Sequence, residues 1–310
     1  MKPLRIGIIG YGKIARDQHA PAIAALDRFE LAAAVSRSGS GAEGVPIYAT
    51  HTEMLAAGDL DAGAICTPPR ARYPIARDCI QAGLHVLLEK PPAVTLSEIE
   101  DLACLAEAKG VTLFATWHAR YNPAVEAAAK ALAGERIAGM EIVWREDVRK
   151  WHPGQQWIWE PGGFGVFDPG INAFSIATRI FPGTLFVKDA VLHFPENRQA
   201  PIAADLHFAS PAADGDMPVT LEWRHSGDEA WTIDVRTVSG KRVELSEGGS
   251  RLAIDGAPVA AEGPGEYPAI YEHFLDLVDT RTSDVDVRPL RLVGDAYLVG
   301  SRTTVAPFED

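Results

Sequence analysis

Cysteine is scarce in this chain, and its cysteines are not arranged as a structural framework. Of 310 residues only Cys66, Cys79 and Cys104 are cysteines, an odd number with no CxxC pair. Disulfide-stabilised domains carry even sets of cysteines, and structural zinc sites carry paired ones, so the sequence predicts neither. The nine histidines occur singly, without the spacing of shared ligands, and we expect no metal site.

Positive charge and long apolar runs are also lacking. The formal net charge is −13, from 29 Lys and Arg against 42 Asp and Glu. Nucleic acids and anionic membranes bind clustered Lys and Arg, so we expect neither as a partner. No apolar run approaches the roughly 20 residues of a membrane span, and the first residues lack the apolar segment of a signal peptide. We therefore expect a cytoplasmic protein.

The first 120 residues alternate between short apolar runs and helical segments. Such alternation predicts a doubly wound parallel sheet, because buried parallel strands are apolar on both faces. The predicted strands are residues 4–9, 31–35, 47–48, 62–66, 85–88 and 111–115. The predicted helices are residues 14–25, 52–57, 72–82 and 97–108. Pro21 should kink or interrupt the first of these helices.

Beyond residue 120 the pattern changes to strands that alternate or are β-branched, which indicates an open, mostly antiparallel sheet. The predicted strands are residues 137–148, 185–194, 202–208, 218–225, 230–237, 242–245 and 251–254. The predicted helices are residues 123–133, 267–279 and 289–303. At roughly 150 residues per domain the length also suggests two domains, which we place at residues 1–120 and 121–310. The fold class is therefore α/β, with a parallel sheet followed by a second α/β domain.

A glycine turn joins the first predicted strand to the first predicted helix. The sequence Gly10-Tyr11-Gly12-Lys13-Ile14-Ala15 matches the GxGxxA fingerprint of dinucleotide-binding Rossmann folds. The glycines let backbone N–H groups approach a pyrophosphate, which the helix N-terminus stabilises. The alternative is a turn with no ligand, but the surrounding strand and helix favour a cofactor site. We predict that Gly10, Gly12, Lys13 and Ile14 bind the cofactor.

The end of the second strand lacks the acid that NAD enzymes place against the ribose 2′-hydroxyl. Ser36 and Arg37 stand there instead. A hydroxyl and a guanidinium suit a 2′-phosphate, because arginine binds phosphate through a forked and permanently charged group. The alternative is a plain polar turn with an exposed arginine. The pattern favours NADP over NAD, with use of both cofactors left open.

Two further strand ends carry candidate residues. Lys90 and Glu89 follow the fifth strand, and Thr67 and Pro68 follow the fourth. Ligands of open α/β sheets bind at the carboxyl ends of the strands, so we predict that these residues line the cofactor site. A partly buried lysine there has an adjustable pKa, which suits catalysis. The alternative is a surface lysine in a proline-rich loop.

Aromatic and polar residues are interleaved between Trp144 and Asn172, where four of the seven tryptophans lie. Carbohydrate pockets need aromatic faces beside hydrogen-bonding groups, so this density favours a sugar site over scattered core positions. Within the segment, Asp168 precedes Pro169 and can cap a helix that starts there. The same helix would bring Asn172 close to the face of Asp168, so a catalytic pair is the alternative.

Four motifs in chain order carry a family resemblance. They are GxGxxA at Gly10–Ala15, Glu89-Lys90-Pro91, Arg120-Tyr121-Asn122-Pro123 and Gly163…Asp168-x-Gly170-x-Asn172. Together they resemble the glucose–fructose oxidoreductase/inositol dehydrogenase (Gfo/Idh/MocA) family over essentially the whole chain. The resemblance implies a Rossmann domain of NAD(P)-binding type and a substrate domain whose open sheet pairs two subunits in a homo-oligomer, most simply a dimer. It also implies that Lys90 and Asp168 act on a sugar or cyclitol hydroxyl.

The chain departs from the family at Asn172, where histidine is common. A neutral amide cannot accept a proton, so we predict Asp168 as general base, Lys90 as the group that stabilises the alkoxide, and Asn172 as a residue that orients a hydroxyl. The segment 144–155 is similar to bacterial dehydrogenases that oxidise L-arabinose or D-galactose at C1. This implies lactone formation with hydride transfer to NADP⁺ or NAD⁺. The alternatives are another sugar or cyclitol dehydrogenase, or a non-catalytic NADP sensor.

Besides Asp168 and Asn172, six residues are candidates for binding the sugar. We expect the polar ones to address hydroxyls and the tryptophans to stack on the ring. They are His118, Asn122, Glu146, Trp151, His152 and Trp231.

Overall fold

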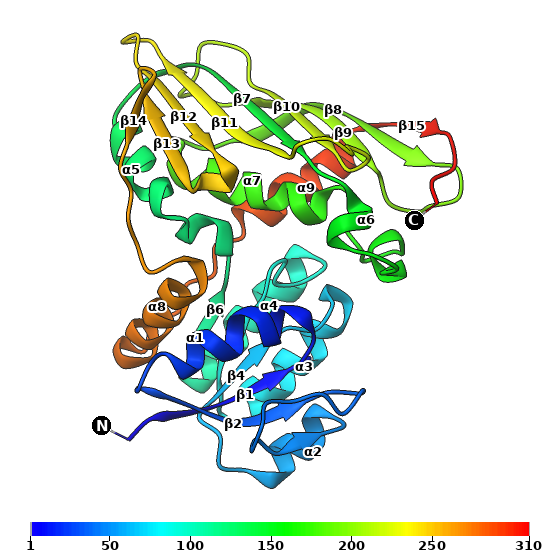
Figure 1. Cartoon of the computed structure of the whole chain (residues 1–310), viewed down its shortest axis with the longest axis vertical. Helices are drawn as coiled ribbons and strands as arrows, with labels where there is room; N and C mark the ends of the chain where they lie inside the picture. Colours follow the sequence, from blue (N-terminus) through cyan, green and yellow to red (C-terminus); the bar gives the residue numbers. More distant parts are fainter. Residues whose placement is uncertain (1, 310) are drawn as a thin grey trace. The chain divides into compact units, whose positions relative to one another are not determined.

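The computed structural model describes residues 2–309, which form two compact units (Figure 1). The first unit takes the chain up to residue 118 together with residues 265–287, and the second takes residues 119–264 and 288 onward. We expected a single division at residue 120. The chain does pass to the second unit near that position, but residues 265–287 return to the first unit.

The first unit is built on a six-stranded parallel sheet with the order β3-β2-β1-β4-β5-β6. The strands are β1 (Leu4–Ile9), β2 (Phe29–Val35), β3 (Ile47–Tyr48), β4 (Ala62–Ile65), β5 (His85–Leu88) and β6 (Leu113–Ala115). The central strands are buried on both faces, which explains their continuous apolar sequence. The predicted doubly wound fold is confirmed, and the strand order reverses between β1 and β4.

The described part of this unit contains five α-helices. They are α1 (Ala20–Ala24), α2 (His51–Ala57), α3 (Pro69–Gln81), α4 (Leu96–Lys109) and α8 (Glu266–Thr280). A π-helical turn, Ala15–His19, leads directly into α1, and the N–H of Ala20 donates to the carbonyl of Ala15. The turn ends two residues before Pro21, whose ring would clash with a regular carbonyl four residues earlier. Pro21 thus widens the helix rather than ending it.

The second unit contains a nine-stranded sheet with the order β14-β13-β12-β11-β7-β10-β9-β8-β15. The strands are β7 (Ile137–Arg145), β8 (Phe186–Pro195), β9 (Ala203–Ala209), β10 (Pro218–Glu222), β11 (Ala230–Thr237), β12 (Arg242–Ser246), β13 (Arg251–Ile254), β14 (Ala257–Val259) and β15 (Ser301–Val305). Among the strands of residues 2–309 in this sheet, the β7–β10 and β8–β15 pairs are parallel and the other pairs are antiparallel. The predicted mostly antiparallel sheet is confirmed.

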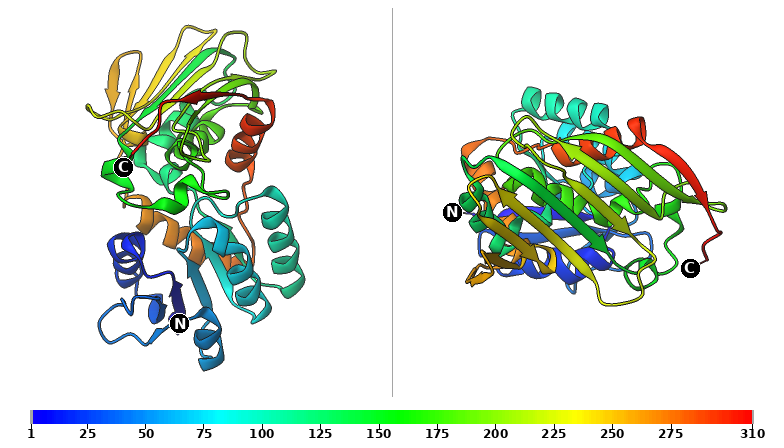
Figure 2. Two further views of the ribbon diagram at one scale, coloured as in Figure 1. Left: turned by 90° about the vertical axis from the view of Figure 1, so that its right-hand side faces the viewer. Right: turned by 90° about the horizontal axis from the view of Figure 1, so that it is seen from above.

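Helices cover one face of this sheet, as the two views of Figure 2 show. They are α5 (Pro123–Leu132), α7 (Phe167–Ile180) and α9 (Arg288–Val299), while the short α6 (Val148–Trp151) follows β7. Within residues 2–309 no helix lies on the opposite face. That face carries ion pairs, among them His193 with Asp205 and His207 with Asp189. Its use in a dimer stays a prediction.

The end of the chain differs from expectation. We predicted one helix over residues 289–303, but α9 ends at Val299 and β15 follows. The β-branched residues Thr303, Thr304 and Val305 pair with β8, which explains the change to a strand. Among the described residues, none of the helices is both long and apolar enough to cross a membrane.

Candidate active site

Four predicted site segments follow neighbouring strands of the parallel sheet. Gly10 follows β1, Ser36 follows β2, Thr67 is the second residue after β4, and Glu89 follows β5. The strands are adjacent and parallel, so these segments share the carboxyl edge of the sheet, where the strand order reverses. This edge is where open α/β sheets bind their ligands.

The glycine turn has the geometry that a pyrophosphate requires. Gly10 has a φ of +92°, and a Cβ there would lie 2.8 Å from the backbone N of Thr67, so no side chain is tolerated. A Cβ on Gly12 would meet open space. The first i−4 bond of the helix joins Arg16 N–H to Gly12 O, so the N–H groups just before Arg16 have no acceptor inside the helix. These features fit a bound dinucleotide, whose phosphates the amides would hold.

The two other residues predicted at this turn are exposed. The Lys13 side chain forms an ion pair with Asp17 one turn along the helix. The Ile14 side chain is 38% exposed, although it is large and apolar. For both residues a role in cofactor binding stays a prediction.

At the end of β2, Ser36 and Arg37 lie in a polar turn. The Ser36 hydroxyl is 3.0 Å from that of Ser38, which in turn is 2.9 Å from that of Ser40. Arg37 is exposed, and no acidic side chain between residues 2 and 309 pairs with it. An exposed, unpaired guanidinium beside hydroxyls fits a 2′-phosphate.

Thr67 and Pro68 connect β4 to α3. The Thr67 carbonyl accepts from the Arg72 side chain at 2.8 Å. Its hydroxyl oxygen is buried and has no hydrogen-bond partner within residues 2–309. Pro68 is exposed and stands at the N-cap of α3. Their role at the cofactor site stays a prediction.

Lys90 follows β5 in a loop whose other side chains are buried. Its backbone N–H donates to Glu89 Oε2 at 2.8 Å. Glu89 is 3% exposed and hydrogen-bonds inside the first unit.

His118 is the predicted sugar ligand in this unit. Its Nδ1 lies 3.1 Å from Glu266 Oε2. Burial lowers the pKa of His118, but Glu266 and Glu89 together outweigh that effect and leave the pKa raised.

The second unit brings three predicted residues to one face of α7. Asp168 and Asn172 are one helical turn apart, and the His152 ring comes from the end of α6. His152 Nε2 lies 3.3 Å from Asp168 Oδ2, and Asp168 is 3% exposed. Asn172 stands where the resemblance would place an imidazole, but His152 provides an imidazole from another element. A buried carboxylate held by an imidazole can accept a proton.

Asp168 does not cap α7. We gave capping as one interpretation of Asp168, with the helix starting at Pro169, but the helix begins at Phe167 and its N-cap is Val166. The N–H of Asp168 bonds to Gly165 O at 2.9 Å, so the residue already belongs to the first turn. Gly170 lets α7 pack closely against β10, because a Cβ at this position would lie 2.5 Å from Leu221 Cδ1. Asp168 is thereby buried beside the sheet.

Tryptophans and a buried carboxylate form a connected cluster in the second unit. Glu146, at the end of β7, accepts from the indole N–H of Trp223 at 3.2 Å and of Trp231 at 2.9 Å. Trp151 is 44% exposed, lies 5.8 Å from Trp231 between ring centroids, and donates to Glu229. Glu146, Trp151 and Trp231 thus place a carboxylate beside aromatic faces, as a sugar site requires.

Sequence reasoning missed Trp223, although it is fully buried and its ring lies 5.3 Å from that of His152. It stands on the predicted strand 218–225, so its position was predictable but its contact with His152 was not.

Asn122 has a different setting from the other candidates. Its amide donates to Gly248 O at 2.8 Å and accepts from Ser250, so it holds a neighbouring loop.

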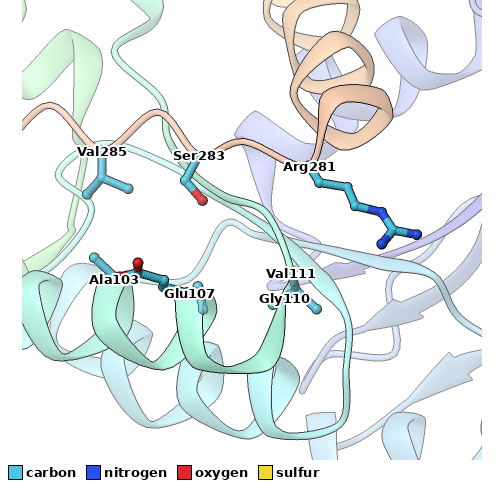
Figure 3. A pocket seen from close by; sticks show the side chains of 8 residues that line it. Ala103, Glu107, Gly110, Val111, Arg281, Ser283 and Val285 are labelled. Atoms are coloured by element: carbon cyan, nitrogen blue, oxygen red, sulfur yellow. The ribbon is translucent and has the colours of Figure 1, made fainter.

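A surface hollow elsewhere in the first unit contains none of these residues. It lies between the end of α4 and the segment after α8, where Glu107 and Arg281 line it (Figure 3). Within residues 2–309 no group of three His, Cys, Asp or Glu side chains is placed to hold a metal ion.

Comparison with known proteins identifies the family. Residues 4–116 match the profile of the GFO_IDH_MocA oxidoreductase family with its NAD-binding Rossmann fold. Over the full length of both proteins the chain is 44% identical to a galactose 1-dehydrogenase of Pseudomonas fluorescens. The chain belongs to the Gfo/Idh/MocA family. It is therefore an oxidoreductase with an NAD-binding Rossmann fold, as the sequence motifs predicted.

Two further similar proteins are informative. The crystal structure of a D-galactose 1-dehydrogenase from Rhizobium etli superimposes with a TM-score of 0.94 at 49% identity, over 100% of this chain and 99% of that one. A D-xylose 1-dehydrogenase (NADP⁺) of Haloferax volcanii is 31% identical over 58% of each chain. The family assignment thus covers both units.

Proposed function

We propose that this protein is an aldose 1-dehydrogenase that oxidises D-galactose, L-arabinose or both to the lactone and prefers NADP⁺. The observation that carries the proposal is the buried Asp168 carboxylate held by His152 beside tryptophan side chains. Full-length similarity to two galactose 1-dehydrogenases supports the choice of sugar.

In the proposed reaction the anomeric hydroxyl loses a proton while C1 loses a hydride, which leaves a lactone carbonyl. A bound nicotinamide supplies the acceptor for the hydride. Asp168 takes the hydroxyl proton, and His152 orients its carboxylate by the contact at 3.3 Å. Lys90 stabilises negative charge on the same oxygen. Asn172 hydrogen-bonds a neighbouring hydroxyl but accepts no proton.

Recognition of the sugar is assigned to the second unit's aromatic side chains and Glu146. Trp151 and Trp231 cover C–H patches of the ring. Both oxygens of Glu146 accept from indole N–H groups, so its carboxylate is held in one orientation. L-Arabinose and D-galactose share their configuration at C2, C3 and C4, so the same contacts serve both.

A panel of aldoses and cyclitols assayed with each cofactor tests this proposal. We expect reduction of the nicotinamide with D-galactose and L-arabinose, and slower turnover with their C4 epimers, because polar groups fixed in place discriminate hydroxyl orientation. Activity only on a cyclitol would contradict the assignment. Tight NADPH binding without turnover of any sugar would indicate a sensor instead.

A further inference from the structure

A fully buried hydrogen-bond network lies behind the Lys90 loop in the first unit. Glu89 Oε1 accepts from the Tyr267 hydroxyl at 2.7 Å and lies 3.0 Å from His19 Nε2. Glu89 Oε2 accepts from the backbone N–H of Lys90 at 2.8 Å. On its other side, His19 Nδ1 lies 2.8 Å from the Tyr271 hydroxyl. One carboxylate thus links the catalytic loop to three other side chains.

Charge holds this network together. Burial raises the pKa of Glu89, but the hydrogen bond and charge of His19, together with the charges of His118 and Arg72, outweigh that effect and leave the pKa well below its ordinary range. Burial lowers the pKa of His19, and its contacts with Cys66, Tyr271 and Glu89 more than reverse this. The carboxylate is therefore ionised and paired. A buried ion needs all its partners, because an unsatisfied one is costly.

A second clamp fixes the backbone on the other side. Arg72 is 4% exposed, and its guanidinium donates to the carbonyls of Glu89 and Pro91, the residues before and after Lys90. The Lys90 backbone is thus held at its own N–H by Glu89 and at both flanking carbonyls by Arg72. These contacts fix the backbone on both sides of Lys90. Because the backbone is fixed, it sets the direction in which the Lys90 side chain leaves the strand.

We propose that Glu89 is a positioning residue for Lys90 and that His19 and Tyr267 act through it. This inference rests on the proposed function, since it takes Lys90 as the group that stabilises the alkoxide. It differs from our prediction that Glu89 binds the cofactor, because the carboxylate oxygens of Glu89 are directed to internal donors. It also gives a reason for the return of α8 to the first unit, since α8 supplies Tyr267 and Tyr271.

Tyr267→Phe is the sharpest test, because it removes one donor to Glu89 and keeps the ring. Losing a hydrogen bond to an ion should lower kcat by about tenfold with D-galactose and NADP⁺, with a KM for NADP⁺ changed by less than about twofold. The matched control is Tyr73→Phe, which removes an exposed tyrosine–carboxylate bond to Asp101 in the same unit. Its kcat should match that of the parent enzyme.

The Lys90→Met background separates positioning from a general structural role. If Tyr267 acts through Lys90, Tyr267→Phe should cause no further loss of kcat in Lys90→Met. An equal loss in both backgrounds, or an unchanged kcat in Tyr267→Phe alone, would overturn the inference. Glu89→Gln, which keeps an acceptor for the Lys90 N–H but loses the charge, should behave as Tyr267→Phe does. Full activity of Lys90→Met would overturn the role of Lys90 and this inference with it, whereas a parent enzyme that reduces neither nicotinamide with any sugar would overturn the proposed function.

Discussion

Asp168→Asn is expected to lower kcat by about a hundredfold or more, because the amide cannot take the anomeric proton. The substitution keeps the size of the side chain and one oxygen for the contact with His152. Steady-state turnover of D-galactose with NADP⁺ measures the effect. Lys90→Met should cause a loss of similar size, since charge developing on the oxygen would lose its partner.

Cofactor binding separates this loss from damage to the fold. Asp168 belongs to the second unit, whereas the glycine turn belongs to the first. The dissociation constant of NADPH, followed by fluorescence, should therefore change by less than about twofold in Asp168→Asn. A kcat close to that of the parent enzyme would refute the role of Asp168 as base.

Arg37→Ala is expected to raise the KM for NADP⁺ by about 10- to 100-fold and to leave the KM for NAD⁺ nearly unchanged, because a hydrogen-bonded charge pair contributes roughly 1.5–3 kcal/mol. The reason is that the 2′-phosphate, which NAD⁺ lacks, would lose its forked partner. Saturation curves with both cofactors at a fixed sugar concentration measure the two constants.

A surface arginine of the same unit provides the control for Arg37→Ala. Arg77 is exposed on α3, and Arg77→Ala should leave both constants unchanged. Equal increases for NADP⁺ and NAD⁺ in Arg37→Ala would contradict the assignment of Arg37 to the 2′-phosphate. They would place its effect on the part of the cofactor that both nucleotides share.

Local sequence patterns predicted most of the fold because each pattern has one dominant physical cause. Continuous apolar runs gave the parallel strands, and the strand 230–237 was predicted to the residue. The return of residues 265–287 was not predicted, since periodicity reports that a helix has a buried face but not which unit buries it. Tyr267, Tyr271 and Phe274 follow helical spacing, and all three are buried in the first unit.

The candidate site was predicted in part for the same reason. Asp168 and Asn172 share a helix, so spacing alone placed them on one face. The contact between His152 and Asp168 joins α6 to α7, and no sequence interval encodes it. The sequence showed His19 only as an isolated histidine. Its contact with Glu89 was not predicted, because the two residues are 70 positions apart in the chain.

Oxidation at C1 is the central claim, and D-galactose deuterated at C1 tests it most directly. Mass spectrometry after turnover would show where the deuterium resides. The account predicts that the reduced nicotinamide carries the label and that the product is an unlabelled lactone. A product that keeps deuterium at C1 while another carbon is oxidised would contradict the account.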